Sequence, residues 1–96
     1  MRHYEVMVII DPDTDDRQVQ PTLDKHLEVI TKAGGSIDNV DLWGRRRLAY
    51  EINKKTEGIY AVLQLTAEPD DVSELHRQFR INESIMRAKV MRPDAH

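Results

Sequence analysis

The sequence has 96 residues, of which 40% are hydrophobic and 32% are charged, so a single soluble domain over residues 1–96 is expected. The absence of cysteine excludes a disulfide framework, a thiolate metal site and a cysteine nucleophile. The formal net charge of −3 argues only weakly against a nucleic-acid partner, because phosphate binding depends on local potential.

The first predicted elements are a strand and a helix. Apolar alternation over residues 3–10 predicts a strand, which ends at the Asp-Pro-Asp turn that follows it. Helical spacing predicts a helix from residue 14 or 15 to about 33, stopped by the glycine pair that begins at Gly34. Pro21 is expected to kink this helix or to delay its start.

A long strand is predicted next, from about residue 36 to 53. Gly44 marks the point where this strand can bend. The turn-rich residues 53–58 are expected to link it to a strand over residues 59–67. That strand is apolar on both alternating sets of positions, as in a central strand.

The last elements are a helix and a short strand. Pro69 and the acids after it predict the start of the helix, and residues 82–83 break it. The final strand is expected over residues 85–92 and ends at Pro93. The order βαββαβ predicts an α+β, ferredoxin-like fold, with a four-stranded antiparallel sheet and two helices on one face.

Such a sheet leaves its second face bare, and strand alternation predicts what lies there. If Leu48, Tyr50 and Ile52 pack against the helices, the alternating residues of their strand point to the bare face. The predicted surface is both basic and apolar. Its cations are Arg45, Arg47, Arg87 and Lys89, and its apolar members are Met7, Trp43, Ile85 and Met91.

The charge of the chain is concentrated in its middle. Residues 44–67 hold five Lys/Arg against two Asp/Glu, whereas residues 1–43 hold four against nine. Two interpretations of the arginine run 45–47 stay open. It is either an edge strand protected by charge against aggregation, or a contact surface, which the neighbouring Trp43 favours.

Catalytic and cofactor sites are not indicated. The four histidines have no metal-ligand spacing, no glycine-rich phosphate loop exists, and the acids at residues 11–16 lack the glycine and glutamate of a calcium loop. Base stacking of the kind used by RNA-recognition motifs is rejected, because the strand over 59–67 lacks the aromatic pair. We expect no enzyme activity, cofactor or small-molecule substrate. The longest aliphatic run, residues 6–10, is too short for a membrane span, so a cytoplasmic location is expected.

Three segments resemble one known family. Residues 44–54, Gly-Arg-Arg-Arg-Leu-Ala-Tyr-Glu-Ile-Asn-Lys, are similar end to end to the signature of the bacterial small-subunit ribosomal protein S6 family. The opening Met-Arg-His-Tyr-Glu and residues 79–87 also resemble that family. The resemblance implies a place in the 30S platform and cooperative binding to the central domain of 16S rRNA with ribosomal protein S18, beside other 30S components.

The resemblance also implies which residues bind the rRNA or the partner protein. These are Arg2, Tyr4, Arg45, Arg46, Arg47, Lys54, Arg87 and Arg92. Strand alternation adds Lys89 and leaves Arg2, Arg46 and Arg92 at strand ends or edges. Met7, Trp43, Ile85 and Met91 are the expected protein-partner surface. Two alternatives remain on the same fold: an acylphosphatase-like or ligand-binding module, and a homodimeric scaffold joined through the bare face. The Asp-rich early loop disfavours the first, because it would repel phosphate.

Overall fold

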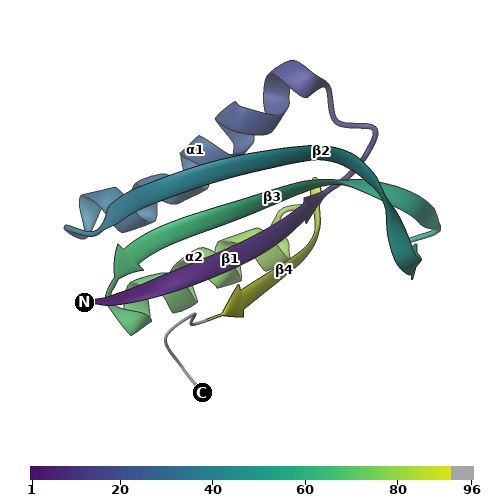
Figure 1. Ribbon diagram of the computed structural model, residues 1–96. Coiled ribbons are helices and arrows are strands. Elements are labelled where there is room, and N and C mark those ends of the chain that lie inside the picture. Colours follow the sequence, from purple (N-terminus) through teal and green to yellow (C-terminus); the bar gives the residue numbers. More distant parts are fainter. Residues whose placement is uncertain (92–96) are drawn as a thin grey trace.

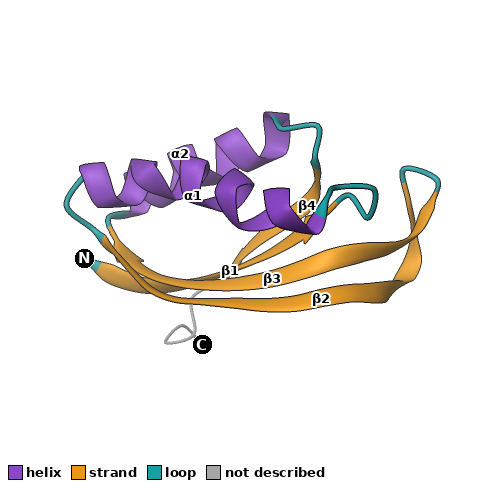
Figure 2. Cartoon of the chain, turned by 90° about the horizontal axis from the view of Figure 1, so that it is seen from above, coloured by secondary structure: helices purple, strands orange, loops and turns teal. Residues whose placement is uncertain are grey.

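The computed structural model describes residues 1–91, and it contains the predicted elements in the predicted order. They are β1 (Arg2–Ile10), α1 (Asp16–Lys32), β2 (Ser36–Ile52), β3 (Lys55–Ala67), α2 (Pro69–Ile81) and β4 (Ile85–Met91). The sheet order is β2-β3-β1-β4, and all neighbouring strands are antiparallel. Both helices cover one face of the sheet (Figures 1 and 2), so the ferredoxin-like prediction is confirmed. The expected strand end at Arg92 and the stop at Pro93 lie outside the described residues.

Helix α1 begins and ends as its sequence predicts. The Asp15 side chain caps it by accepting a hydrogen bond of 2.9 Å from the Arg17 N–H. The backbone turns away after the helix at Gly34, whose φ is +93°. The helix runs through Pro21 rather than starting after it, at the cost of one intrahelical hydrogen bond.

The core lies between the two helices and the sheet. Each helix contributes one buried stripe, and β1 and β3 contribute alternate residues. The largest fully buried side chains include Phe79, Ile10, Leu23, Ile30 and Leu63. This side of the sheet is therefore closed, and only the opposite side remains for contacts with other molecules.

The hairpin between β2 and β3 is longer and tighter than expected. Asn53 and Lys54 both have positive φ, 50° and 64°, as in a two-residue type I′ turn. β3 consequently starts at Lys55, and the predicted six-residue linker is mostly strand. The hairpin extends beyond the rest of the sheet (Figures 1 and 2).

The register of β2 shifts between Leu42 and Gly44, and this changes which residues face the helices. Gly44 has φ +82°, which is the conformation a β-bulge requires of a glycine. One extra residue in a strand moves every later side chain to the other face. The prediction that Leu48, Tyr50 and Ile52 pack against the helices is therefore wrong.

Candidate partner-binding face

The sheet face that no helix covers is called the open face below. Strand pairing places Met7 and Ile9 of β1 beside Lys89 and Arg87 of β4 on this face. The distal part of β2 adds Leu48, Tyr50 and Ile52, because of the bulge described above. The predicted mixture of basic and apolar side chains is present there, although β2 supplies different residues from those expected beyond its bulge.

A cavity of about 170 Å³ lies on the open face. Its lining comes from all four strands and consists of Met7, Ile9, Leu48, Ala49, Tyr50, Ile52, Tyr60, Arg87 and Lys89. Gly58 allows the strands to approach closely beneath it, since a Cβ there would lie 2.5 Å from Ile9 Cγ2 and 3.5 Å from Leu48 Cδ2. The floor is apolar and the rim is cationic, which suits an inserted side chain of a partner.

Tyr50 and Arg87 join the two edge strands across the open face. The Arg87 guanidinium donates a hydrogen bond to the Tyr50 hydroxyl, and its Cζ lies 5.9 Å from the centre of the Tyr50 ring. Tyr50 is nevertheless 58% exposed. Exposed tyrosine and arginine side chains in mutual contact are typical of interface hot spots.

An aromatic pair lies beside this cavity and was not foreseen from the sequence. Trp43 of β2 stacks on Tyr60 of β3, with ring centres 6.2 Å apart and an interplanar angle of 7°. The Arg46 guanidinium lies 5.1 Å from the centre of the Trp43 ring, and Trp43 Nε1 donates to Asp41 at 3.0 Å. Both rings lie on the open face, where Trp43 was predicted, and strand pairing sets Tyr60 opposite Gly44, the residue after Trp43.

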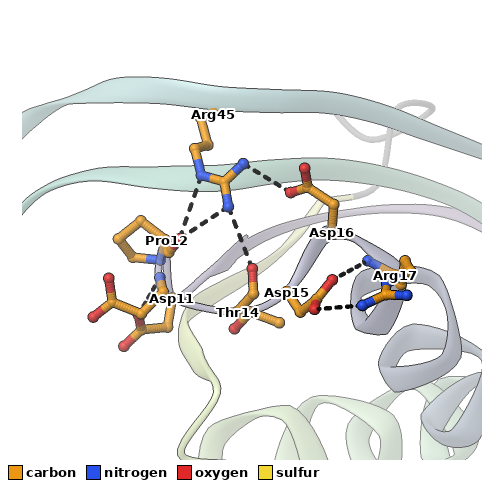
Figure 3. A network of polar contacts seen from close by, with 8 residues as sticks. Asp11, Pro12, Thr14, Asp15, Asp16, Arg17 and Arg45 are labelled. Carbon is orange, nitrogen blue, oxygen red and sulfur yellow. Dashed lines mark hydrogen bonds and ion pairs between the residues drawn. The ribbon is translucent and has the colours of Figure 1, made fainter.

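Arg45 does not lie on the open face, which corrects the prediction. Its guanidinium points to the loop between β1 and α1 (Figure 3), where Nη1 donates to the Asp16 carboxylate at 2.7 Å. The same group donates to the backbone carbonyls of Pro12, at 3.1 and 3.3 Å, and of Thr14, at 3.3 Å. Arg47 shares this side of β2 by strand alternation, so the expected cluster of positions 45, 47 and 87 does not form.

Other predicted site residues divide between surface and core. Lys54 is exposed at the hairpin tip and Arg2 at the start of β1. Tyr4 is 6% exposed and belongs to the core, so its ring is not available to a partner. Ile85 is also a core residue, 7% exposed, because a register shift between Ile9 and Ile10 turns it toward the helices.

Met91 pairs with Glu5 and lies on the open face as predicted. Arg92 lies outside the described residues.

The end of the open face away from the hairpin is polar. Asp38 accepts hydrogen bonds from the Thr66 hydroxyl at 2.6 Å and from the Ser36 hydroxyl at 2.8 Å, and His3 Nδ1 lies 3.7 Å from it. The Thr66 hydrogen bond is the main reason why the pKa of Asp38 lies below its ordinary value of 3.8. The open face thus has a cationic, apolar end and an acidic end.

This pKa shift predicts a pH dependence that Asp38→Asn should remove. A carboxyl whose pKa is lower in the folded state stabilises the fold above about pH 4, and the contribution is lost as the pH falls through the folded-state value. Between pH 5 and pH 2, the free energy of unfolding should fall less in the variant than in the parent protein. The difference should correspond to the titration of one carboxyl group. Urea unfolding at several pH values measures this, with Asp70→Asn as the control. Identical slopes in both variants and the parent would contradict the assignment.

Within the described residues 1–91, histidines and acids form no cluster of three or more that suits a metal ion. Neither helix in this part of the chain has the length and apolarity needed to cross a membrane.

The comparisons with known proteins agree with this architecture. Residues 3–92 match the family model described as "Ribosomal protein S6". Proteins named "Small ribosomal subunit protein bS6" from Beutenbergia cavernae and Nocardioides sp. are 62% and 64% identical over 96 residues, covering all of both chains. The crystal structure of 30S ribosomal protein S6 from Thermotoga maritima superposes with a TM-score of 0.86 at 32% identity, covering 95% of this chain and 86% of that one. The chain therefore belongs to the ribosomal protein S6 family, whose members are structural, non-enzymatic proteins of the small subunit of the bacterial cytoplasmic ribosome.

Proposed function

We propose that the protein binds the central domain of 16S rRNA, in the platform of the 30S subunit, cooperatively with ribosomal protein S18. One observation carries the proposal: the open face combines an apolar cavity with the cations Arg46, Arg87 and Lys89. Membership of the S6 family supports a role in the small subunit. Ordinary surface would not place an apolar hollow and exposed aromatic rings among positive charges.

The two kinds of partner would use different parts of the molecule. The cavity and the exposed Tyr50 suit the protein, because protein interfaces are anchored by a few aromatic and arginine residues around a pocket. Exposed cations along the hairpin, Arg46, Arg47 and Lys54, suit phosphates of the RNA. Arg2 and Arg92 remain candidates for either partner from their positions in the sequence.

The charge of the chain explains why two partners would be needed. With a net charge of −3, only the cationic end attracts RNA, so the protein alone should bind weakly. Each phosphate contact adds roughly 0.7 to 0.9 to the salt dependence, so five contacts would give a slope of about −4. A basic partner on the open face would add further contacts, and the joint complex would be much tighter.

The expected result is a higher affinity for RNA when S18 is present. Binding of a 16S central-domain fragment, measured with and without purified S18, should differ by about 5- to 150-fold, the usual range of coupling between two ligands. By reciprocity, the RNA should raise the affinity for S18 by the same factor. Equal RNA affinities would contradict the cooperative account.

Sedimentation of the free protein tests the remaining alternative. A tight homodimer joined through the open face would block the proposed S18 surface and would support the homodimeric scaffold instead. We expect a monomer, since the cavity rim is cationic in both copies and like charges would meet.

A further inference from the structure

We infer that Arg45 is a positioning residue, which fixes the base of the hairpin so that Trp43 and Arg46 stand together on the open face. The inference rests on the proposed function and adds a division of labour within the arginine run 45–47. Arg46 would face the partners, and Arg45 would hold it in place without contacting them.

The chemistry of the Arg45 contacts favours an anchor. Its guanidinium reaches one carboxylate, of Asp16, and two backbone carbonyls, of Pro12 and Thr14 (Figure 3). Neutral carbonyls offer no charge to be balanced, so they act mainly by fixing where the guanidinium lies. A planar fork that meets several acceptors at once cannot turn to a phosphate without breaking all of these bonds.

The acidic loop meets the hairpin a second time through Lys55 of β3. The Lys55 ammonium pairs with the Asp13 carboxylate, and this hydrogen bond raises the pKa of Lys55. Arg45 and Lys55 belong to the two strands of the hairpin, Arg45 near its base and Lys55 next to the turn at its tip, so the loop over residues 11–16 contacts both strands.

The bulge explains why such an anchor would matter. Nothing lies within 4 Å of the place where a Cβ of Gly44 would be, so no neighbouring side chain packs against the bulge at that point. Trp43 precedes the bulge and Arg46 follows it. On the open face, the Arg46 Cζ lies 5.1 Å from the centre of the Trp43 ring. If Arg45 were released, the bulge would lose its side-chain link to the loop over residues 11–16, and Trp43 and Arg46 would be held together less firmly.

The single tryptophan of the chain makes this measurable in the free protein. In Arg45→Met, we expect acrylamide to quench Trp43 fluorescence more strongly, because the ring loses Arg46 and Tyr60 as neighbours. Arg45→Lys should behave like Arg45→Met, since an ammonium cannot bridge the same acceptors. A further variant, Asp16→Asn, removes the charge of the carboxylate that binds Arg45. Its matched control is Glu74→Gln, which makes the same charge change but breaks the Arg77 pair on α2.

RNA binding in the presence of S18 supplies the second readout. Arg45→Met should raise the dissociation constant for the 16S central-domain fragment about tenfold, because the side chains of Trp43 and Arg46 would have to be ordered on binding. The salt dependence of binding should not change, since Arg45 contacts no phosphate. Arg46→Met should instead reduce the salt slope by roughly 0.9. Asp16→Asn should weaken binding in the same direction as Arg45→Met, while Glu74→Gln should have no effect.

Three results would overturn the inference. They are unchanged Trp43 quenching in Arg45→Met, full rescue by Arg45→Lys, and tighter RNA binding by Asp16→Asn. The last would mean that the acidic loop competes with RNA for Arg45. Failure of the parent protein to bind RNA and S18 would refute the proposed function instead, while the quenching result in the free protein would still decide the role of Arg45.

Discussion

Arg87→Ala is expected to raise the dissociation constant for S18 about 30-fold or more, the effect of losing an interface hot spot. Arg87 forms the rim of the open-face cavity and holds Tyr50 through a hydrogen bond and a cation–π contact. Because Arg87 is exposed, its removal leaves no cavity in the core, and the free energy of unfolding should change by less than about 0.5 kcal/mol. Calorimetric titration and urea unfolding measure the two effects.

Matched variants separate the parts of this contact. Tyr50→Phe keeps the ring and removes only the hydroxyl that accepts from Arg87, so it should weaken binding less than Arg87→Ala. Arg77→Ala removes an arginine paired with Glu74 on α2, away from the open face, and should leave binding unchanged. A large loss of stability with unaltered S18 binding would make Arg87 a structural residue.

Phe79→Ala is expected to have the largest effect on stability, a loss of about 3 to 5 kcal/mol. Phe79 is fully buried in α2, and the ring of His26 of α1 packs edge-on against it, with centres 5.3 Å apart. Truncation removes this ring contact between the two helices and leaves a cavity that neither helix can fill without moving. Since small domains are stable by only about 5 to 15 kcal/mol, much of the total would be lost.

Urea unfolding followed by circular dichroism measures this effect. Ile81→Ala is the control on the same helix, because Ile81 is 67% exposed and its truncation should change the free energy of unfolding by less than about 0.5 kcal/mol. Similar losses in the two variants would show that Phe79 is not part of the core as described.

The fold was predictable because its signals are local and repeated. The buried helix stripe that begins at Val19 and the alternation of β1 each follow one period along their whole length. Gly34 and Asp15 mark the helix ends through backbone conformation and capping, which depend on few neighbours. Such features need no knowledge of the tertiary structure.

The site was less predictable because it depends on two interruptions of strand alternation. The prediction carried one parity from Val40 to Ile52, but the bulge at Gly44 sends Leu48 and Arg46 to the open face and Arg45 to the other. Gly44 was a visible signal for a bend, but the sequence does not state whether a glycine bends a strand or inserts a residue. The second shift, between Ile9 and Ile10 of β1, places Ile85 in the core and leaves no signal in the β4 sequence.

Arg87 and Lys89 were placed correctly on the open face, because the pairing of β4 with β1 has no register shift between these two residues. Burial of Tyr4 was compatible with its place on the apolar face of β1, and only the family resemblance suggested a binding role. A resemblance transfers residue types more reliably than side-chain directions.

The most direct test of the open face as the shared surface is an NMR titration of the labelled protein, first with S18 and then with the 16S central-domain fragment. We predict that S18 shifts the resonances of Met7, Tyr50 and Lys89 around the cavity, and that RNA then shifts those of Arg46 and Lys54 on the hairpin. The exposed sides of α1 and α2 should remain unchanged. Shifts centred on the helices, with an unperturbed cavity, would contradict the account.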